Sequence, residues 1–533
     1  MRPNESLLIK YLDLWSAADL RMSSGRGRAS SDSSRIYGIK KLREFILELA
    51  VSGGLSENEG GWRNGKLSDL GIWAVGSGFP SIEQGVVGAE ILFAKVSDMN
   101  LQGNEKYITY TNNSISEETA RRLKVNIHPP GTVIFPKIGG AIATNKRRIL
   151  KKRTAIDNNC LGIIPANDVH PEWVFLQLSS LDLSKYQVGT SVPALSQGVL
   201  GEIAISIPDP QDQTSVINKV NELMLLCDDL EDKSICLSVA HEKLTREFLI
   251  NLLSSQDSKE QKKIQTRFLD LFDTLFISEK SINLLKSALI ELAIQGGLTG
   301  QNSSDGSGAE LLATICCERA NSPEANRKRK ILPIDVASLP KIPDSWVWTQ
   351  NEHISHDWGQ KIPTEPFVYI DVSSIDSESG TVSTPEVVLP EDAPSRARKI
   401  VRPGSVIYST VRPYLLNVAI IDRQFDMEPI ASTAFVVIQP MASISSKYVF
   451  YYLRSPTFIK YVESVQTGTT YPAINDAQFY SSPFPLPPLA EQHRIVDKLE
   501  ELLNLCDEMR RFILHANEHQ RKIADALVEQ GLV

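Results

Sequence analysis

Apolar residues recur at alternating steps of three and four positions in two long stretches of the chain. The first stretch runs from Val216 to Phe248 and the second from Ile495 to Leu527. This spacing is typical of a helix with one apolar seam, and about 35 residues of helix span roughly 50 Å. The central seam positions are Val220, Leu223, Cys227, Leu230, Leu499, Leu502, Cys506 and Met509. We expect the two helices to pack on each other; the alternative is that each seam docks on its own domain.

The segments that precede these helices have a different pattern. Short β-branched runs at 132–135, 405–408 and 434–438 are bounded by glycine and proline, which predicts strands. Segments 171–181 and 446–453 have the pattern of short helices. The fold class is therefore predicted to be α/β (mixed α+β), with globular regions that alternate with long helices.

The chain also contains an internal duplication. Residues 189–230 align without a gap on 468–509, with twelve identical positions at a constant offset of 279. PGTVIF (130–135) matches PGSVIY (403–408), and LREFILELAVSGGL (42–55) resembles LKSALIELAIQGGL (285–298). Such a long period indicates two copies of a globular unit, each followed by a long helix, rather than a solenoid.

These patterns predict five regions along the chain. They are an N-terminal helical region (1–60), a first globular domain (61–208), a central helical spacer region (209–300), a linker with a second globular domain (301–488) and a C-terminal helical spacer region (489–533).

The charge of the chain is unevenly distributed. The 533 residues carry a net charge of -8, which argues against a surface that is basic all over. Residues 61–208 nevertheless hold 15 Lys and Arg against 12 Asp and Glu, and the acidic excess lies in the long-helix regions and the linker. No apolar run approaches the roughly 18 residues of a membrane span, and the N-terminus lacks the pattern of a signal peptide. We therefore expect a cytoplasmic protein.

Basic clusters near the PG-strand elements are the first candidates for phosphate or base contacts. Neutralising DNA phosphates requires clustered cations, although a basic run alone is more often a solvated face. The candidates are Arg121, Lys124, Lys146, Arg147, Arg148, Lys151, Arg396, Arg398, Lys399 and Arg412.

A repeated QxGT[ST]xP motif precedes each long helix, at 187–193 and 466–472. Its glycine and hydroxyls are suited to a turn that grips a phosphate or a base edge, which makes Thr190, Ser191, Thr469 and Thr470 candidates. The alternative is a turn that only fixes the corner between strand and helix.

The sequence shows no convincing enzyme or metal site. There is no GxxxxGK[ST] phosphate loop, and His353 and His356 lack an obvious third metal ligand. Asp209 with Glu231 and Lys233 matches the PD-(D/E)xK nuclease pattern only superficially, because Glu231 and Lys233 fall inside the predicted helix. We predict no catalytic residue and no metal ligand.

Four segments carry a family resemblance: LPPLAEQHRIVDKLEELLNLCDEM (486–509), RPGSVIYSTVRPYLLNVAI (402–420), ASTAFVVIQP (431–440) and GIKKLREFILELAVSGGL (38–55). With them, the chain resembles the specificity subunit of type I restriction-modification systems over nearly its whole length. IPDPQD (207–212) departs from its counterpart LPPLAE (486–491), which leaves the first domain-to-helix corner uncertain.

The resemblance implies a DNA-binding subunit without catalytic activity. Its two target-recognition domains would be separated by two long antiparallel coiled-coil-like helices in a pseudo-twofold duplication, and each domain would read one half of a bipartite, asymmetric double-stranded DNA site. Partners would be two modification (methyltransferase) subunits and the restriction subunits, an ATP-dependent translocase and endonuclease. No cofactor is expected in this chain, since S-adenosylmethionine, ATP and Mg²⁺ serve the partners. The competing hypothesis is a coiled-coil scaffold with twin protein-binding domains.

Overall fold

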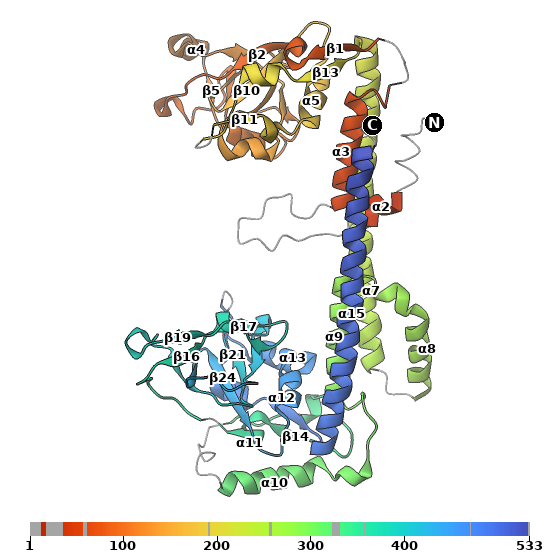
Figure 1. Ribbon diagram of the computed structural model, residues 1–533, viewed down its shortest axis with the longest axis vertical. Coiled ribbons are helices and arrows are strands. Elements are labelled where there is room, and N and C mark those ends of the chain that lie inside the picture. Colours follow the sequence, from red (N-terminus) through yellow and green to blue (C-terminus); the bar gives the residue numbers. More distant parts are fainter. Residues whose placement is uncertain are drawn as a thin grey trace. The chain divides into compact units, whose positions relative to one another are not determined.

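The computed structural model describes residues 12–17, 36–56, 61–189, 192–254, 258–321, 331–356, 358–468 and 471–530. The chain divides into two compact units, of which the first comprises Met1–Ser238 with Ala516–Val533 and the second Val239–His515. Each unit contains one mixed α/β domain and segments of long helix (Figure 1). The predicted fold class is confirmed.

The first domain is built on a five-stranded and a four-stranded sheet. The five-stranded sheet comprises, in order, β2 (Gly71–Val75), β10 (Cys160–Pro165), β7 (Val133–Pro136), β8 (Arg148–Leu150) and β4 (Tyr107–Ile108). The four-stranded sheet comprises β5 (Ser114–Ile115), β3 (Ile91–Ala94), β9 (Thr154–Ile156) and β6 (Ile127–His128). Helix α5 (Pro171–Ser180) shares a core with β7 through Trp173, Val174 and Leu178. The pair β1 (Arg63–Lys66) and β13 (Ala204–Ile207) completes the domain with α4 (Glu117–Leu123).

The second domain repeats this plan. One sheet comprises β15 (Ser355–His356), β24 (Phe435–Pro440), β21 (Val406–Ser409) and β22 (Val418–Ile420). The other comprises β19 (Glu386–Val388), β16 (Phe367–Ile370), β23 (Pro429–Ser432) and β20 (Ala397–Ile400). Helices α12 (Ser446–Leu453), α13 (Pro456–Val465) and α14 (Asp476–Tyr480) cover the core, and β14 (Val347–Gln350) pairs with β25 (Pro483–Leu486).

Corresponding strands of the two domains make the same pairings. The PG strands, β7 and β21, each pair antiparallel with the next strand (β8 or β22) and with a long strand (β10 or β24). Each second sheet has one parallel pair, β3 with β9 and β16 with β23. The strands predicted at 132–135, 405–408 and 434–438 and the helices at 171–181 and 446–453 are thus confirmed as β7, β21, β24, α5 and α12.

The long helices are α7 (Pro210–Ser254) and α15 (Leu489–Gln530), and both contain residues of both units. Shorter helices are α2 (Leu12–Ala17), α3 (Tyr37–Val51), α8 (Ser258–Leu275), α9 (Glu279–Ile294) and α10 (Gly308–Asn321). Within the described part of the chain, no helix is long and apolar enough to cross a bilayer.

In the first unit, the seam of α7 has three partners. Val220 and Cys227 are buried, and Leu223 and Leu230 pack partly buried against the same core. That core contains Phe45 and Leu49 of α3, Ala524 and Val528 of α15, and residues of the first domain. Both expectations for the seam hold in part, because α7 shares a core with its own domain and with the other long helix.

The second unit uses the seam of α15 in the same way. Leu499 is buried in the core of the second domain, whereas Cys506 lies in a separate core with Leu285 of α9 and Leu249 of α7. Met509 packs against that core, and Leu502 is half-buried. The short helices α3 and α9, which the sequence-based expectation did not assign to the seam, complete it in both units.

Each long helix begins at an equivalent corner of its own domain, where a carboxylate of the first helical turn accepts a hydrogen bond from a tryptophan. The Asp212 carboxylate accepts hydrogen bonds from Trp62 Nε1 at 2.5 Å and Ser56 Oγ at 2.6 Å. Glu491, 279 positions later, accepts from Trp346 Nε1 at 2.9 Å. Although IPDPQD differs from LPPLAE, it therefore retains a carboxylate, Asp212, that bonds the tryptophan at this corner.

At each corner, a buried glutamine links the first turn of the long helix to backbone groups of the domain. The Gln213 amide accepts a hydrogen bond from the His170 backbone N–H at 2.7 Å and donates to the Pro208 carbonyl at 2.9 Å. Gln492 bonds equivalent backbone groups in the second unit. Both side chains are fully buried, so this repeated glutamine joins the first helical turn to the domain.

Candidate nucleic-acid interface

In each domain the PG-strand hairpin ends in a short irregular connection. Tip 1 (residues 137–147) joins β7 to β8, and tip 2 (residues 410–417) joins β21 to β22. Each contains a 3₁₀ turn, at Gly139–Thr144 and at Pro413–Leu415, that ends on a residue with a left-handed φ of 51°, Asn145 or Leu416. The two tips therefore share a backbone form although their sequences differ.

The repeated QxGT[ST]xP segment docks on each tip. We call residues 187–195 signature loop 1 and residues 466–474 signature loop 2. In the first domain, Gly139 N donates to the Pro193 carbonyl at 2.8 Å and Leu195 N to the Lys137 carbonyl at 2.9 Å. In the second, Arg412 N donates to the Pro472 carbonyl at 2.9 Å and Ile474 N to the Thr410 carbonyl at 3.1 Å. Two elements found separately in the sequence thus form one composite surface in each domain.

The glycine of each signature loop is required by its backbone. Gly189 and Gly468 have φ values of 93° and 89°, a region that favours glycine. A Cβ atom on Gly468 would lie 2.8 Å from the Tyr471 carbonyl oxygen. This geometry supports the turn interpretation of the motif. The hydroxyl candidates Thr190, Ser191, Thr469 and Thr470 lie outside the described residues, and their phosphate contacts stay a prediction.

Three of the six cation candidates of the first domain are exposed. Arg121 and Lys124 lie at the C-terminal end of α4, and Lys124 has a left-handed φ of 51°. Lys151 is exposed, with its Nζ 4.0 Å from the centroid of the Tyr107 ring. Lys146 is half-buried and donates to the Asn100 side-chain oxygen.

Arg147 is a correction to the predicted set. It is 3% exposed and makes four hydrogen bonds, including those from Nε to the Leu178 carbonyl at 2.9 Å and from Nη2 to the Leu181 carbonyl at 3.2 Å. Burial lowers the pKa of its guanidinium to about 9, so it remains charged at neutral pH. Arg148 is half-buried, and its Nη2 donates to the Met99 carbonyl at 2.6 Å. These contacts commit the Arg147 guanidinium to the interior of the domain, which argues against a direct contact with DNA.

The second domain divides its cations in the same way. Arg396 is exposed, and Arg398 is half-buried at an irregularity between β20 and β23. Lys399 is a second correction, since it is 4% exposed and its Nζ bonds the Asp476 carboxylate at 2.9 Å. Arg412 is half-buried in tip 2, with its guanidinium carbon 4.8 Å from the centroid of the Tyr471 ring.

Sequence reasoning missed three side chains of the composite surfaces. Lys137 is half-buried at the start of tip 1, where its carbonyl holds signature loop 1. Tyr414 in tip 2 is 55% exposed and Tyr471 in signature loop 2 is 65% exposed. Tyr471 occupies the variable position before the proline of the repeated motif, where the first domain has Val192.

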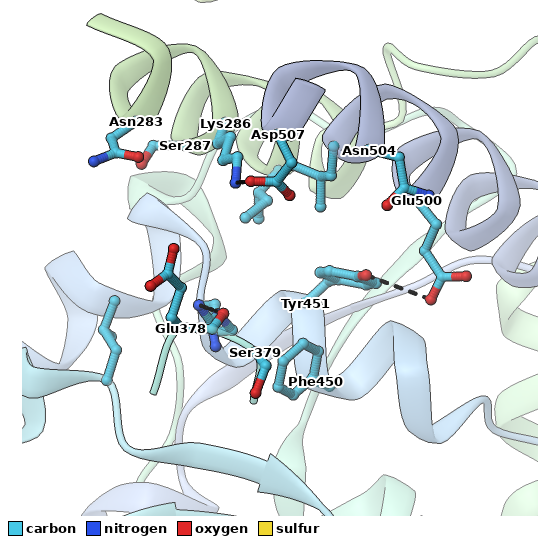
Figure 2. A pocket seen from close by; sticks show the side chains of 14 residues that line it. Asn283, Lys286, Ser287, Glu378, Ser379, Phe450, Tyr451, Glu500, Asn504 and Asp507 are labelled. Carbon is cyan, nitrogen blue, oxygen red and sulfur yellow. Dashed lines mark hydrogen bonds and ion pairs between the residues drawn. The ribbon is translucent and has the colours of Figure 1, made fainter. Parts of the chain in front are cut away.

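A cavity of about 630 Å³ lies in the second unit between α9, α15 and the second domain. Its lining pairs Lys286 with Asp507 and the Tyr451 hydroxyl with Glu500 (Figure 2). The first unit has an equivalent ion pair, Arg43–Asp228, with an N–O distance of 2.5 Å. The two pairs correspond because Asp228 and Asp507 are 279 positions apart. The cavity therefore belongs to the joint between domain and helices. Among the described residues, no cluster of His, Cys, Asp and Glu suited to a metal ion is present.

Comparison with known proteins agrees with this duplicated arrangement. The model of the "Type I restriction modification DNA specificity domain" matches twice, at residues 89–235 and 376–514. The EcoAI specificity subunit of a type I restriction enzyme from Escherichia coli is 25% identical over 99% of both chains. The EcoEI specificity subunit from the same organism is 23% identical over the same shares. A crystal structure of an HsdS subunit from Thermoanaerobacter tengcongensis is 36% identical over 33% of this chain and 46% of that chain, with a TM-score of 0.30.

Proposed function

Since the chain belongs to the type I restriction-modification DNA specificity family, we propose that each of its domains reads one half of a bipartite, asymmetric DNA site. The chain is a specificity subunit, which recognises DNA, assembles with other subunits and has no catalytic activity of its own. We further propose how the DNA site is divided between the two domains and which partner subunits bind the chain.

The duplicated tip and signature loop carry this proposal. Both domains bond tip to loop by the same two backbone contacts, yet tip 1 begins KIGG (137–140) where tip 2 begins TVRP (410–413). A shared backbone with different side chains is what two readers of different base sequences need. The proposed DNA surface comprises Lys137, Arg121, Lys124, Lys146 and Lys151 in the first domain and Arg396, Arg398 and Arg412 in the second.

The helices supply the proposed docking faces for partners. Leu225, Leu226 and Leu237 of α7 are 68%, 58% and 70% exposed, and Phe512 of α15 is 76% exposed. Large exposed apolar side chains on charged helices are typical of surfaces that partner proteins cover. We propose that two modification subunits dock there, that restriction subunits join the complex, and that the helices set the gap between half-sites.

S-adenosylmethionine, ATP and Mg²⁺ are proposed to act in the partner subunits, and this chain is proposed to hold no cofactor. Its proposed location is the cytoplasm, where it meets the DNA.

Methylation mapping tests the proposed division of the site. Cells that express this chain with its modification subunits should methylate adenine in one discontinuous motif, with two specific segments separated by a fixed gap. Long-read sequencing measures the motif, and cells that express the modification subunits without this chain are the control. A continuous motif, or none, would contradict the proposal.

The competing hypothesis, a scaffold with twin protein-binding domains, makes a different prediction about salt. Affinity for DNA through phosphates falls steeply as salt rises, because each neutralised phosphate releases counterions. A protein-binding scaffold should show no salt-sensitive affinity for DNA in any partner complex.

Reversing the exposed cations should weaken DNA binding without changing its sequence preference. Arg121→Glu or Lys151→Glu in the assembled complex should each lower affinity about tenfold and reduce the slope of log affinity against log salt by about 1, because each removes one phosphate contact. Lys66→Glu is the matched control, since Lys66 is exposed but lies outside the proposed surface. Fluorescence anisotropy at several salt concentrations measures both quantities, and an unchanged slope would exclude the mutated residue from the interface.

A further inference from the structure

Arg412 occupies a backbone conformation that favours glycine. Its φ is 49°, and the residue that makes the same backbone contact in tip 1 is Gly139, with a φ of 72°. A glycine could adopt this conformation in tip 2 without strain. Residues in strained backbone conformations persist only where the surrounding structure holds them, and they cluster at functional sites.

The surroundings fix the Arg412 backbone on both sides. Its N–H donates to the Pro472 carbonyl at 2.9 Å, and its carbonyl accepts from Leu415 N at 3.0 Å. The following residue, Pro413, is buried in the domain. The backbone of this residue is therefore fixed at the end of the hairpin.

The Arg412 guanidinium stacks on the ring of Tyr471. The guanidinium carbon lies 4.8 Å from the ring centroid, and Tyr471 is 65% exposed. Within the described residues, Arg412 makes no ion pair with a carboxylate. Stacking on an aromatic ring orients a planar guanidinium while leaving its N–H groups available for hydrogen bonds.

Two other stacked arginines of the second domain use their guanidinium donors differently. Arg454 lies over Phe450 and Arg423 over Phe425, but each also donates to backbone carbonyls, of Ser377 and Val382 respectively. Their donors are used inside the domain. Arg412 differs from these two arginines because, among the described residues, its half-buried guanidinium donates no hydrogen bond, and because it lies in the tip that bonds the signature loop.

We propose that Arg412, stacked on Tyr471, reads a guanine in the half-site of the second domain. A guanidinium fork donates to the O6 and N7 atoms of guanine in the major groove, a pairing that no other base offers. The first domain has Gly139 and Val192 in place of this pair, so the reading is specific to the second half-site. The inference rests on the proposed function and names the base and the residues within it.

The test uses the full chain assembled with its modification subunits and maps methylation motifs. Arg412→Ala should relax one guanine position in one half-site, lowering the preference for guanine there by roughly 10- to 100-fold, and leave the other half-site unchanged. Arg412→Lys should relax the same position, because lysine keeps the charge but lacks the fork. Tyr471→Ala should have a weaker effect at that position, and Tyr471→Phe, which retains the ring, should restore it.

Arg402→Ala is the matched control, because Arg402 is also stacked, 3.6 Å from Trp358, but precedes β21 whereas tip 2 follows it. Its motif should equal the wild-type motif. An unchanged motif in Arg412→Ala would overturn the inference, as would a uniform loss of methylation that Arg412→Lys restores, since that result indicates a phosphate contact. Failure of the proposed function is distinguishable, because the wild-type complex would then give no bipartite motif at all.

Discussion

Replacing Arg147 by alanine should destabilise the first domain by about 3 kcal/mol while leaving the second domain unchanged. The guanidinium donates to the carbonyls of Leu178 and Leu181, at the C-terminal end of α5. The last carbonyls of a helix have no partner within the helix, and a positive charge there is favourable. Alanine leaves these acceptors unpaired in the interior, at about 1–3 kcal/mol for each buried group.

Hydrogen exchange read by mass spectrometry can localise this effect. Amides of α5 should exchange roughly 100-fold faster in Arg147→Ala, because each 1.4 kcal/mol changes an equilibrium constant about tenfold. Peptides from the second domain serve as an internal control. Lys151→Ala is the matched variant from the same basic run, and its effect should stay within about 0.5 kcal/mol because Lys151 is exposed. A stable Arg147→Ala protein that lost only DNA affinity would contradict this assignment.

The basic run at 145–153 shows where sequence reasoning about the site ends. The sequence pattern does not distinguish Arg147, Arg148 and Lys151 from one another, but in the structure they are buried, half-buried and exposed respectively. What separates them is the packing of β8 against α5, elements whose contacts arise only in the folded domain. Charge clustering located the basic run but could not separate its buried residues from its exposed ones.

The duplication made more of the fold predictable than of the site. An offset of 279 residues, visible in the sequence, also relates the Asp212 and Glu491 corners and the Asp228 and Asp507 ion pairs. The composite surfaces were not predictable in the same way. Each motif was found, but the backbone bonds that join tip to loop link residues 54 to 64 positions apart and leave no local pattern.

The heptad spacing also fails to predict which residues of α7 are buried toward its C-terminal end. The spacing predicts that Leu244 lies in the α7 seam, yet Leu244 is 61% exposed, and Thr245 and Leu249 are buried instead. The apolar face of α7 changes along the helix because the first unit and the second unit present it with different neighbours. A heptad count cannot anticipate such a shift, since it assumes one partner throughout.

Replacing Gln492 by leucine should destabilise the second unit by about 2–4 kcal/mol. The Gln492 side-chain oxygen accepts from Ser445 N at 3.0 Å, and its amide donates to the Pro487 carbonyl at 3.0 Å. Leucine has a similar volume but satisfies neither backbone group, and both are left unpaired in the interior. Because Ser445 caps α12, protection of the α12 amides from hydrogen exchange should fall together with that of the first turn of α15.

The duplication supplies a matched second variant and a control. Gln213→Leu should produce the same loss in the first unit, and Gln211→Leu, two positions earlier and exposed, should stay within about 0.5 kcal/mol of wild type. Since Gln213 and Gln492 bond no common residue, their losses should add to within about 0.5 kcal/mol in the double variant. A large departure from additivity would mean that the two corners are energetically coupled. Additive losses, each confined to its own unit, would show that the repeated glutamine of the family motif is a local fastening between a domain and its helix.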